Sequence, residues 1–384
     1  MKIGFLTGHA PSVYMFRLDC MKYLQTRGFE VFVLAPEPKE EWGAAFEEHG
    51  IAYTQVSLSK NSTNPLNDIK TYFDLRKKLK AYRPDVVFCD HAKMIVYGLL
   101  AAKHTGIRHR LVMLGGVGSV LRDPPENFKR KLIKKLLTIE YRVALPKADR
   151  IFFQNKDDLA LFKDLKMAKD EQAVMVPGSG VNLERFPQTP LPKNRNFLFV
   201  GRLIRDKGLM EYMEAGRLLR TKYPEAELHI VGYFDPNQTM LSIGDLQPYI
   251  DDGTVIFHGE QKNVLPFLQD CFAFVLPSYH EGTPRSVLEA LSVGRPVITT
   301  DAPGCRETVI DGKNGFLVPV KDAKAIARAM ETLCADRELA ERMARGSRSF
   351  AEETFDVNIV CNIINQTILQ VTEKEQRGKQ YEPV

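Results

Sequence analysis

The feature that most constrains the fold of this chain is a repeated alternation of short apolar runs with longer helical patterns. Each run is rich in Val, Ile, Leu or Phe and is followed by a glycine or polar break and then by helical spacing. Such alternation predicts βαβ units and parallel sheets. Because the runs are apolar almost throughout, we expect helices on both faces of each sheet. The runs are KIGFLT, EVFVLA, DVVFCD, HRLVML, RIFFQN and AVMVPG, and then NFLFVG, ELHIVG, TVIFHG, FAFVLPS, PVITT and GFLVP.

These runs form two series, separated by the proline-punctuated stretch FPQTPLPKN. A chain of 384 residues is also about the right length for two domains. We therefore expect an α/β fold of two doubly wound, Rossmann-like domains facing a cleft, with a C-terminal helix that crosses back. The expected parts are an N-terminal domain (1–186), a linker (187–195), a C-terminal domain (196–354), a C-terminal helix (355–372) and a polar tail (373–384).

Charge and composition restrict the class of protein. Residues 1–186 carry 30 Lys and Arg against 21 Asp and Glu (+9), and residues 187–384 carry 23 against 27 (−4), so an anionic partner is expected for the first half only. The six cysteines are widely spaced, and neither a metal-ligand pattern nor an apolar run of about 18 residues occurs. We expect a cytoplasmic protein with reduced thiols.

The stretch SYHEGTPRSVLEAL (278–291) predicts an anion site at the start of a helix. Thr283 is a suitable N-cap and Pro284 a suitable first helical residue, so the following amides would face a phosphate. Glu281 and Glu289 would accept hydrogen bonds from hydroxyl groups. Two hydroxyl-rich rings flanking a diphosphate describe a nucleotide sugar. Taken alone, the pair more often represents one exposed glutamate and one glutamate in a capping turn.

The second candidate stretch is FVGRLIRDKG (199–208). Arg202 and Lys207 follow a buried strand on the loop that opens the next helix. An arginine can hold two phosphate oxygens and a lysine adds a mobile charge, so the pair suits a leaving diphosphate. An ordinary surface loop with two cations is the alternative. No D-x-D sequence occurs, and we expect catalysis without a metal ion or another cofactor.

These two stretches, together with PGSGVNLERF (177–186), resemble the donor domain of retaining family-four glycosyltransferases of the GT-B architecture. The resemblance covers essentially the whole chain. It implies that Arg202 and Lys207 hold the diphosphate, Glu289 the ribose and Glu281 the donor sugar. It further implies phosphate contacts from the segment that contains Gly282, Thr283, Arg285 and Ser286.

In the first domain, His91 follows the strand DVVFCD. A lone histidine in such a place is more often structural, but the resemblance implies a contact with the donor sugar. The segments KNSTNPLND, DHAKM and GGVGSVLRD are similar to bacterial enzymes that add N-acetylgalactosamine or galactose to undecaprenyl-diphosphate-linked bacillosamine. The candidates for the acceptor side are Ser12, Asn64, Gly115, Gly116 and Gly118.

The stretch ENFKRKLIKKLLTIEYRVAL (126–145) predicts an amphipathic helix. We expect its apolar face to lie in the core and its basic face to meet anionic lipid headgroups. Solvated cations are the alternative. Nucleic acid is not an expected partner, because the patch lacks interleaved aromatic residues. The residues of this membrane patch are Arg130, Lys131, Lys134, Lys135 and Arg142.

The resulting hypothesis is a retaining, metal-independent transferase. It moves N-acetylgalactosamine or galactose, in α linkage, from a UDP sugar to an undecaprenyl-diphosphate-linked saccharide in glycoprotein or surface-glycan assembly. It is expected at the inner face of the cytoplasmic membrane. Two alternatives stay open: a transferase of the same fold with a soluble acceptor, and a non-enzymatic nucleotide-sugar sensor.

Overall fold

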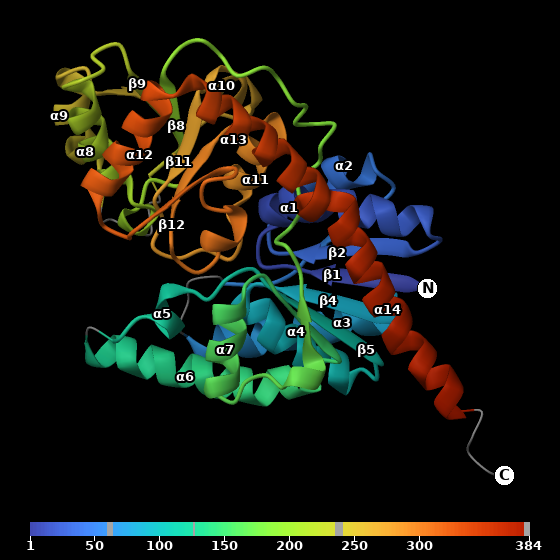
Figure 1. Cartoon of the computed structure of the whole chain (residues 1–384). Coiled ribbons are helices and arrows are strands. Elements are labelled where there is room, and N and C mark those ends of the chain that lie inside the picture. The colour runs from blue at the N-terminus through green and yellow to red at the C-terminus, as the bar shows by residue number, and fades with distance from the viewer. Residues whose placement is uncertain (60–63, 126, 235–240, 380–384) are drawn as a thin grey trace. The chain divides into compact units, whose positions relative to one another are not determined.

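The computed structural model describes residues 1–59, 64–125, 127–234 and 241–379 (Figure 1). Their contacts divide the chain into two compact units. The first unit joins residues 1–179 to the segment that begins at Val357, and the second unit spans Gly180–Asp356. Each unit contains one parallel sheet with its own helices, which confirms the predicted fold class.

The first unit contains a seven-stranded parallel sheet with the strand order β3-β2-β1-β4-β5-β6-β7. Phe5 on β1, next to the central strand β4, lies opposite Val33 on one neighbouring strand and Phe88 on the other. Helices α3, α4 and α6 pack in succession, and α1 packs against α14 (Figure 1). The strands are β1 (Lys2–Leu6), β2 (Glu30–Ala35), β3 (Ala52–Gln55), β4 (Val86–Asp90), β5 (His109–Leu114), β6 (Arg150–Phe153) and β7 (Ala173–Met175). The helices are α1 (Ala10–Thr26), α2 (Lys39–Glu47), α3 (Pro65–Tyr82), α4 (Ala92–His104), α5 (Ser119–Arg122), α6 (Phe128–Ala144), α7 (Lys156–Asp164) and α14 (Val357–Lys379).

The second unit contains a six-stranded parallel sheet with the order β10-β9-β8-β11-β12-β13. In this order β8 lies between β9 and β11, so the loops that leave β8 and β11 share one edge of the sheet. The strands are β8 (Asn196–Val200), β9 (Glu227–Val231), β10 (Val255–Phe257), β11 (Ala273–Leu276), β12 (Val297–Thr300) and β13 (Gly315–Val318). The helices are α8 (Leu209–Arg220), α9 (Ile243–Asp251), α10 (Leu265–Asp270), α11 (Arg285–Val293), α12 (Ala323–Ala335) and α13 (Arg337–Phe350).

The division between the units comes earlier than the expected linker at 187–195. Val181 and Phe186 are buried in the core of the second unit. Within the expected linker, the buried Arg295 donates to the carbonyl of Thr189, and Arg337 donates to that of Pro192. Residues 187–195 are therefore part of the second unit and not a linker.

The C-terminal helix returns to the first unit, as expected, but it is longer than the sequence indicated. It was expected at 355–372 and is observed as α14 at Val357–Lys379. Val360, Ile364 and Ile368 pack in a cluster that also contains residues of β1 and α1. Much of the expected polar tail (373–384) thus continues the helix, and residues 380–384 lie outside the described residues.

Candidate functional site

In the second unit, the loop after β8 is held against the loop after β11. The amide of Tyr279 donates to the carbonyl of Asp206 at 2.8 Å, and the Ser278 hydroxyl donates to the same oxygen at 3.0 Å. Gly208 has a φ of +71°, and a Cβ at this position would lie 2.1 Å from the Pro277 carbonyl oxygen. Only glycine allows this approach. The contact fixes the position of the neighbouring Lys207.

Lys207 and Glu281, which sequence analysis assigned to one ligand, form an ion pair. Their side chains are only 16% and 13% exposed. Each charge is therefore largely removed from water, and the two charges compensate each other. A ligand with both an anionic group and a hydroxyl group could engage the ammonium and the carboxylate separately. The structure brings these two residues together, and their roles stay predictions.

The backbone around Glu281 is fixed by a glycine that sequence analysis missed. The Glu281 amide donates to the Pro303 carbonyl at 2.9 Å. Gly304 has a φ of +79°, and a Cβ there would lie 2.2 Å and 2.3 Å from the carbonyl oxygens of Glu281 and Gly282. The sequence APG, which follows a strand, could have signalled a turn here, but it does not show which loop that turn supports.

Helix α11 begins one residue later than expected. Its N-cap is Pro284 and not Thr283, because Pro284 has extended backbone angles (φ −71°, ψ 112°). The Val287 amide, expected to face a ligand, instead donates to the Pro284 carbonyl at 3.0 Å. The N-terminal turn, which includes Ser286, still carries the positive end of the helix dipole and is suited to an anion.

Glu289 lies one turn into α11 and is buried. Its carboxylate accepts a hydrogen bond from Arg285 Nε at 3.2 Å. Burial raises the pKa of Glu289, and the nearby Arg285 opposes this rise only in part. The carboxylate can therefore gain from hydrogen-bond donors such as the hydroxyl groups of a ribose.

Replacing Glu289 with glutamine is expected to raise the unfolding temperature at neutral pH. The pKa of Glu289 lies above its ordinary value of 4.5, mainly because the group is buried. An acid with a raised pKa in the folded state lowers stability as pH rises from the unfolded-state pKa to the folded-state pKa. The variant should therefore gain stability relative to wild type above pH 4.5 and little below it. Thermal unfolding at acidic and neutral pH measures the difference.

The control for this experiment is Glu338→Gln on α13. The Glu338 side chain is 90% exposed, so its removal should leave the pH dependence of unfolding unchanged. An equal change in unfolding temperature at both pH values for Glu289→Gln would contradict the effect of burial.

Arg202 follows Gly201 at the same edge of the second sheet, and its side chain is exposed. The residues that follow Arg202 stay at this edge, because the Leu203 amide donates a hydrogen bond to the Tyr233 carbonyl, just after β9, at 2.8 Å. The structure thus places Arg202 on the same loop as Lys207. A role in holding a diphosphate stays a prediction.

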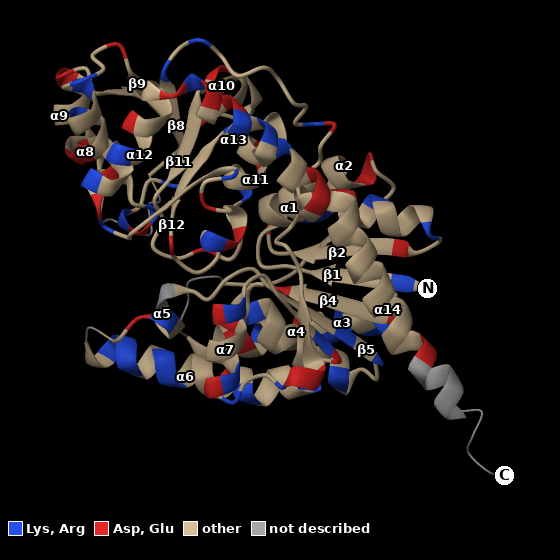
Figure 2. Ribbon diagram, in the orientation of Figure 1, with Lys and Arg blue, Asp and Glu red and all other residues tan. Residues whose placement is uncertain are grey.

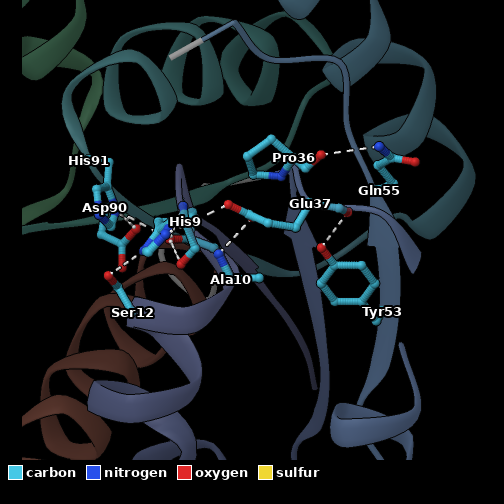
Figure 3. Close-up of polar contacts among 10 residues, drawn as sticks. His9, Ala10, Ser12, Pro36, Glu37, Tyr53, Gln55, Asp90 and His91 are labelled. Carbon is cyan, nitrogen blue, oxygen red and sulfur yellow. Dashed lines mark hydrogen bonds and ion pairs between the residues drawn. The ribbon is translucent and has the colours of Figure 1, made fainter. Parts of the chain in front are cut away.

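In the first unit, His91 is the N-cap of α4 and has an unusual backbone conformation (φ +63°, ψ 137°). Its Nδ1 lies 2.7 Å from Asp90 Oδ1 and 3.2 Å from Thr7 Oγ1 (Figure 3). Burial by itself raises the pKa of Asp90, but His91, Thr7 and Arg17 outweigh it and hold the pKa below its ordinary value. An ionised Asp90 accepts a hydrogen bond from His91 Nδ1–H, and the other ring nitrogen, Nε2, therefore points away from the carboxylate. The backbone angles of His91 are strained for a residue other than glycine, and such strain is typical of functional sites.

A second polar group in this unit was missed by sequence analysis. Glu37, two residues after β2, accepts a hydrogen bond from the Ala10 amide at 2.8 Å and so caps α1 (Figure 3). His9 Nε2 lies 4.0 Å from the other oxygen of Glu37, and His9 Nδ1 lies 2.7 Å from Ser12 Oγ. The predicted acceptor residue Ser12 therefore belongs to a His9–Glu37 group. The position of Glu37 just after a parallel strand is the feature of the sequence that could have indicated this polar group.

The other acceptor-side candidates have simple local roles. Asn64 is the N-cap of α3, and its side chain accepts from the Leu66 amide at 3.0 Å. Gly115, Gly116 and Gly118 follow β5, and only Gly116 has a positive φ (+125°). A Cβ at Gly118 would meet no atom within 4 Å, so this position needs glycine neither for space nor for conformation. Their contact with an acceptor stays a prediction.

The predicted membrane helix is observed as α6, but most of its large apolar residues are exposed and not in the core. Tyr141 and Ala144 are its buried residues. The helix packs through them and through Leu137, which leaves the opposite side exposed. The expectation of a buried apolar face is therefore wrong for the exposed residues Phe128, Leu132, Leu136 and Ile139.

The five basic residues of α6 also divide into two groups by their contacts and exposure. Arg130 and Lys134 both contact Asp123. Arg130 forms an ion pair with its carboxylate at 3.7 Å, and Lys134 Nζ donates a hydrogen bond to its backbone carbonyl at 3.0 Å. Lys131, Lys135 and Arg142 are exposed, although Arg142 Nε also donates to the Leu165 carbonyl at 2.8 Å. Three of the five predicted cations thus line the open side of the helix.

Within the described ranges, no group of three or more His, Cys, Asp or Glu side chains is arranged to hold a metal ion. Over the same part of the chain, every helix is too short or too polar to cross a lipid bilayer.

The fold and the sites define a class of protein with two Rossmann-like domains, of the kind called GT-B. Residues 181–350 match the family described as "Glycosyl transferases group 1". Residues 15–178 match the "Glycosyl transferase 4-like domain". Together these matches span most of the chain, and the chain belongs to this glycosyltransferase family. The predicted family and architecture are confirmed.

Similar proteins differ in what their names say they act on. The chain is 29% identical to the N,N'-diacetylbacillosaminyl-diphospho-undecaprenol alpha-1,3-N-acetylgalactosaminyltransferase of Campylobacter jejuni, over 94% of this chain and 96% of that protein. It is 23% identical to the capsular polysaccharide biosynthesis glycosyltransferase CapM of Staphylococcus aureus, over 98% and 99% of the two chains. The structure of Anabaena Alr3699/HepE in complex with UDP superposes with a TM-score of 0.77 at 19% identity, and covers 96% of this chain and 100% of that one.

Proposed function

We propose that this glycosyltransferase moves N-acetylgalactosamine or galactose from a UDP sugar to a saccharide carried on undecaprenyl diphosphate. The observation that carries the proposal is the partly desolvated Lys207–Glu281 pair, on loops that share one sheet edge with the start of α11. A cation and a helix N-terminus suit a diphosphate, and a nearby carboxylate suits sugar hydroxyls. The second unit is thus proposed to bind the donor.

The choice of donor and acceptor draws on similar proteins. The Campylobacter jejuni relative is named for transfer of N-acetylgalactosamine to a bacillosaminyl-diphospho-undecaprenol. The Anabaena protein of similar fold was solved with UDP and with UDP-glucose. A UDP sugar and a polyprenyl-diphosphate saccharide are accordingly the substrates to test first.

The proposed mechanism retains the configuration of the donor sugar. The bond between C1 and the β-phosphate oxygen breaks, and the acceptor hydroxyl attacks C1 from the same face. Its proton passes to the departing β-phosphate. Arg202, Lys207 and the start of α11 stabilise the charge that develops on the diphosphate, so a metal ion is not required. Glu281 and His91 orient sugar hydroxyls and form no covalent bond.

The acceptor is proposed to bind to the first unit at the membrane surface. Ser12, Asn64 and the glycines after β5 are the proposed contacts. The excess of positive charge in residues 1–186 suits the acceptor diphosphate and anionic lipids on the inner face of the cytoplasmic membrane.

A donor screen tests this proposal. UDP-N-acetylgalactosamine, UDP-galactose and their gluco epimers are each incubated with a short-chain polyprenyl-diphosphate bacillosamine, with and without EDTA. We expect transfer from the galacto donors, an α linkage by NMR, and no loss of rate with EDTA. Transfer to a free saccharide but not to the lipid-linked one would favour a soluble acceptor. Donor binding without transfer or hydrolysis would favour a sensor.

A further inference from the structure

The open side of α6 carries a stripe of large apolar side chains. They follow a spacing of three or four residues, and at about 100° per residue they fall within an arc of about 80°. In a typical soluble protein such a stripe packs against the core. Here the residues and their exposed fractions are Phe128 (81%), Leu132 (48%), Leu136 (52%), Ile139 (47%) and Val143 (49%).

Exposed cations flank this apolar stripe. At the same angular spacing, Lys129 lies on one side of it, and Lys131, Lys135 and Arg142 lie on the other. The helix contains a single acidic residue, Glu140, which accepts a hydrogen bond from Tyr97 on α4 at 2.9 Å. The open side of α6 therefore combines an apolar centre with positive edges. Figure 2 shows the concentration of Lys and Arg along this helix.

The helix is fixed to the first unit along its other side. Tyr141 and Ala144 are buried, and Leu137 packs against the same core. This attachment determines which side of α6 stays open. It also means that the stripe is exposed on a folded scaffold and does not depend on a separate folding step.

We propose that α6 lies in the plane of an anionic bilayer, with the apolar stripe inserted below the headgroups and the flanking cations at the phosphate level. This deepens the proposed function, because it names the surface that presents a lipid-linked acceptor. A helix of 17 residues is about 25 Å long, shorter than the roughly 30 Å of hydrocarbon, and it is highly charged, so it lies along the membrane and does not cross it.

Charge complementarity favours a bilayer over a second copy of this chain. Two stripes packed face to face would bring the flanking cations of both copies together, and like charges across an interface are unfavourable. Anionic headgroups would instead neutralise them. A loop after β5 leads through α5 into α6, so the inserted helix is close in sequence to the candidate acceptor glycines.

The first test measures vesicle binding by the full chain. The triple variant Leu132→Ser/Leu136→Ser/Ile139→Ser should bind phosphatidylglycerol-containing vesicles at least about tenfold more weakly than wild type, because three apolar side chains no longer insert. Ile243→Ser, which alters an apolar residue of similar exposure (48%) on α9, should bind like wild type. Unchanged vesicle binding by the triple variant would overturn the inference.

A second measurement reports insertion directly. All six cysteines are buried, so Leu136→Cys provides a selectively labelled site for an environment-sensitive fluorophore. We expect a blue shift on phosphatidylglycerol vesicles for this label and none for a label at Ile243→Cys. Binding without a shift would mean that the cations act alone and would overturn insertion. If the protein dimerised in the absence of lipid, and the blue shift appeared only as the protein concentration rose, a second copy of the chain would be the partner of the apolar stripe.

The proposed function is tested separately with a short-chain acceptor in vesicle-free solution. The triple variant should transfer sugar to this acceptor at the wild-type rate. Loss of vesicle binding with normal transfer supports the inference. Normal vesicle binding by wild type without transfer from any donor would contradict only the proposed function.

Discussion

Lys207→Ala is expected to lower kcat at least tenfold, which corresponds to about 1.4 kcal/mol of transition-state stabilisation. Lys207 is held at the edge of the second sheet by Gly208 and is paired with Glu281. When the sugar leaves the diphosphate, negative charge grows on the β-phosphate, and an ammonium that is 16% exposed is weakly screened by water. Initial rates at saturating donor and acceptor measure the loss.

The matched control for this variant is Lys222→Ala. Lys222 also forms an ion pair with a glutamate in the second unit, Glu331, at 2.7 Å, but its side chain is 63% exposed. Its loss should leave kcat unchanged. If Lys207→Ala retained wild-type kcat while remaining folded, the proposed diphosphate site would be wrong.

A double-mutant comparison separates catalysis from stability. Lys207→Ala leaves the Glu281 carboxylate without its lysine partner at 13% exposure, and this should reduce the free energy of unfolding by roughly 1–3 kcal/mol. Adding Glu281→Ala should recover part of that stability, because the largely buried carboxylate that has lost its lysine partner is removed. It should not recover kcat, since both side chains are proposed to contact the donor.

The strands were predictable from the sequence because most of them are apolar on both faces. All twelve runs correspond to strands, and the runs EVFVLA and HRLVML match β2 and β5 residue for residue. Strand β3 was missed. Its sequence AYTQ is short and half polar, as suits an edge strand, and it is paired only with β2. The other edge strands, β7, β10 and β13, have apolar sequences and were found, but a strand as polar as β3 cannot be identified by hydrophobicity alone.

The candidate site was predictable in part for a similar reason. Lys207 and Glu281 lie 74 residues apart but follow neighbouring strands, and the rule that ligand sites form at the carboxyl ends of parallel strands places both at one edge. Gly304 and Glu37 were missed, because their roles depend on contacts with segments distant in sequence: the loop at Glu281 for Gly304 and the start of α1 for Glu37.

Helix α6 shows the limit of amphipathic patterns. The sequence correctly indicated an amphipathic helix, but the apolar stripe and three of the five cations share its open side, and the sequence could not show which side packs against the protein. The core of the first unit takes Leu137, Tyr141 and Ala144, and the apolar stripe is left open. The spacing of apolar residues identifies two faces of a helix, and the neighbouring helices decide which one is buried.

The backbone of His91 leads to the second large effect that we expect. His91→Ala and His91→Gly both remove the imidazole, and each should lower kcat/KM at least tenfold if His91 orients the sugar. Their stabilities should differ. A φ of +63° with a ψ of 137° is strained for alanine but readily adopted by glycine, so His91→Gly should be more stable than His91→Ala by roughly 1 kcal/mol. Urea unfolding and steady-state kinetics measure the two effects.

Arg83 is the control for the comparison of alanine with glycine, because it also has a positive φ. It is the C-cap of α3 and has a φ of +47°, and Arg83→Gly should also be more stable than Arg83→Ala. Neither Arg83 variant should change kcat/KM, because the residue precedes β4 at the opposite edge of the sheet from His91. A protein that keeps a strained histidine where glycine would be more stable gives up stability for the side chain. If His91→Gly kept full activity, that reasoning would fail, and the interaction of His91 with Asp90 and Thr7 would be structural alone.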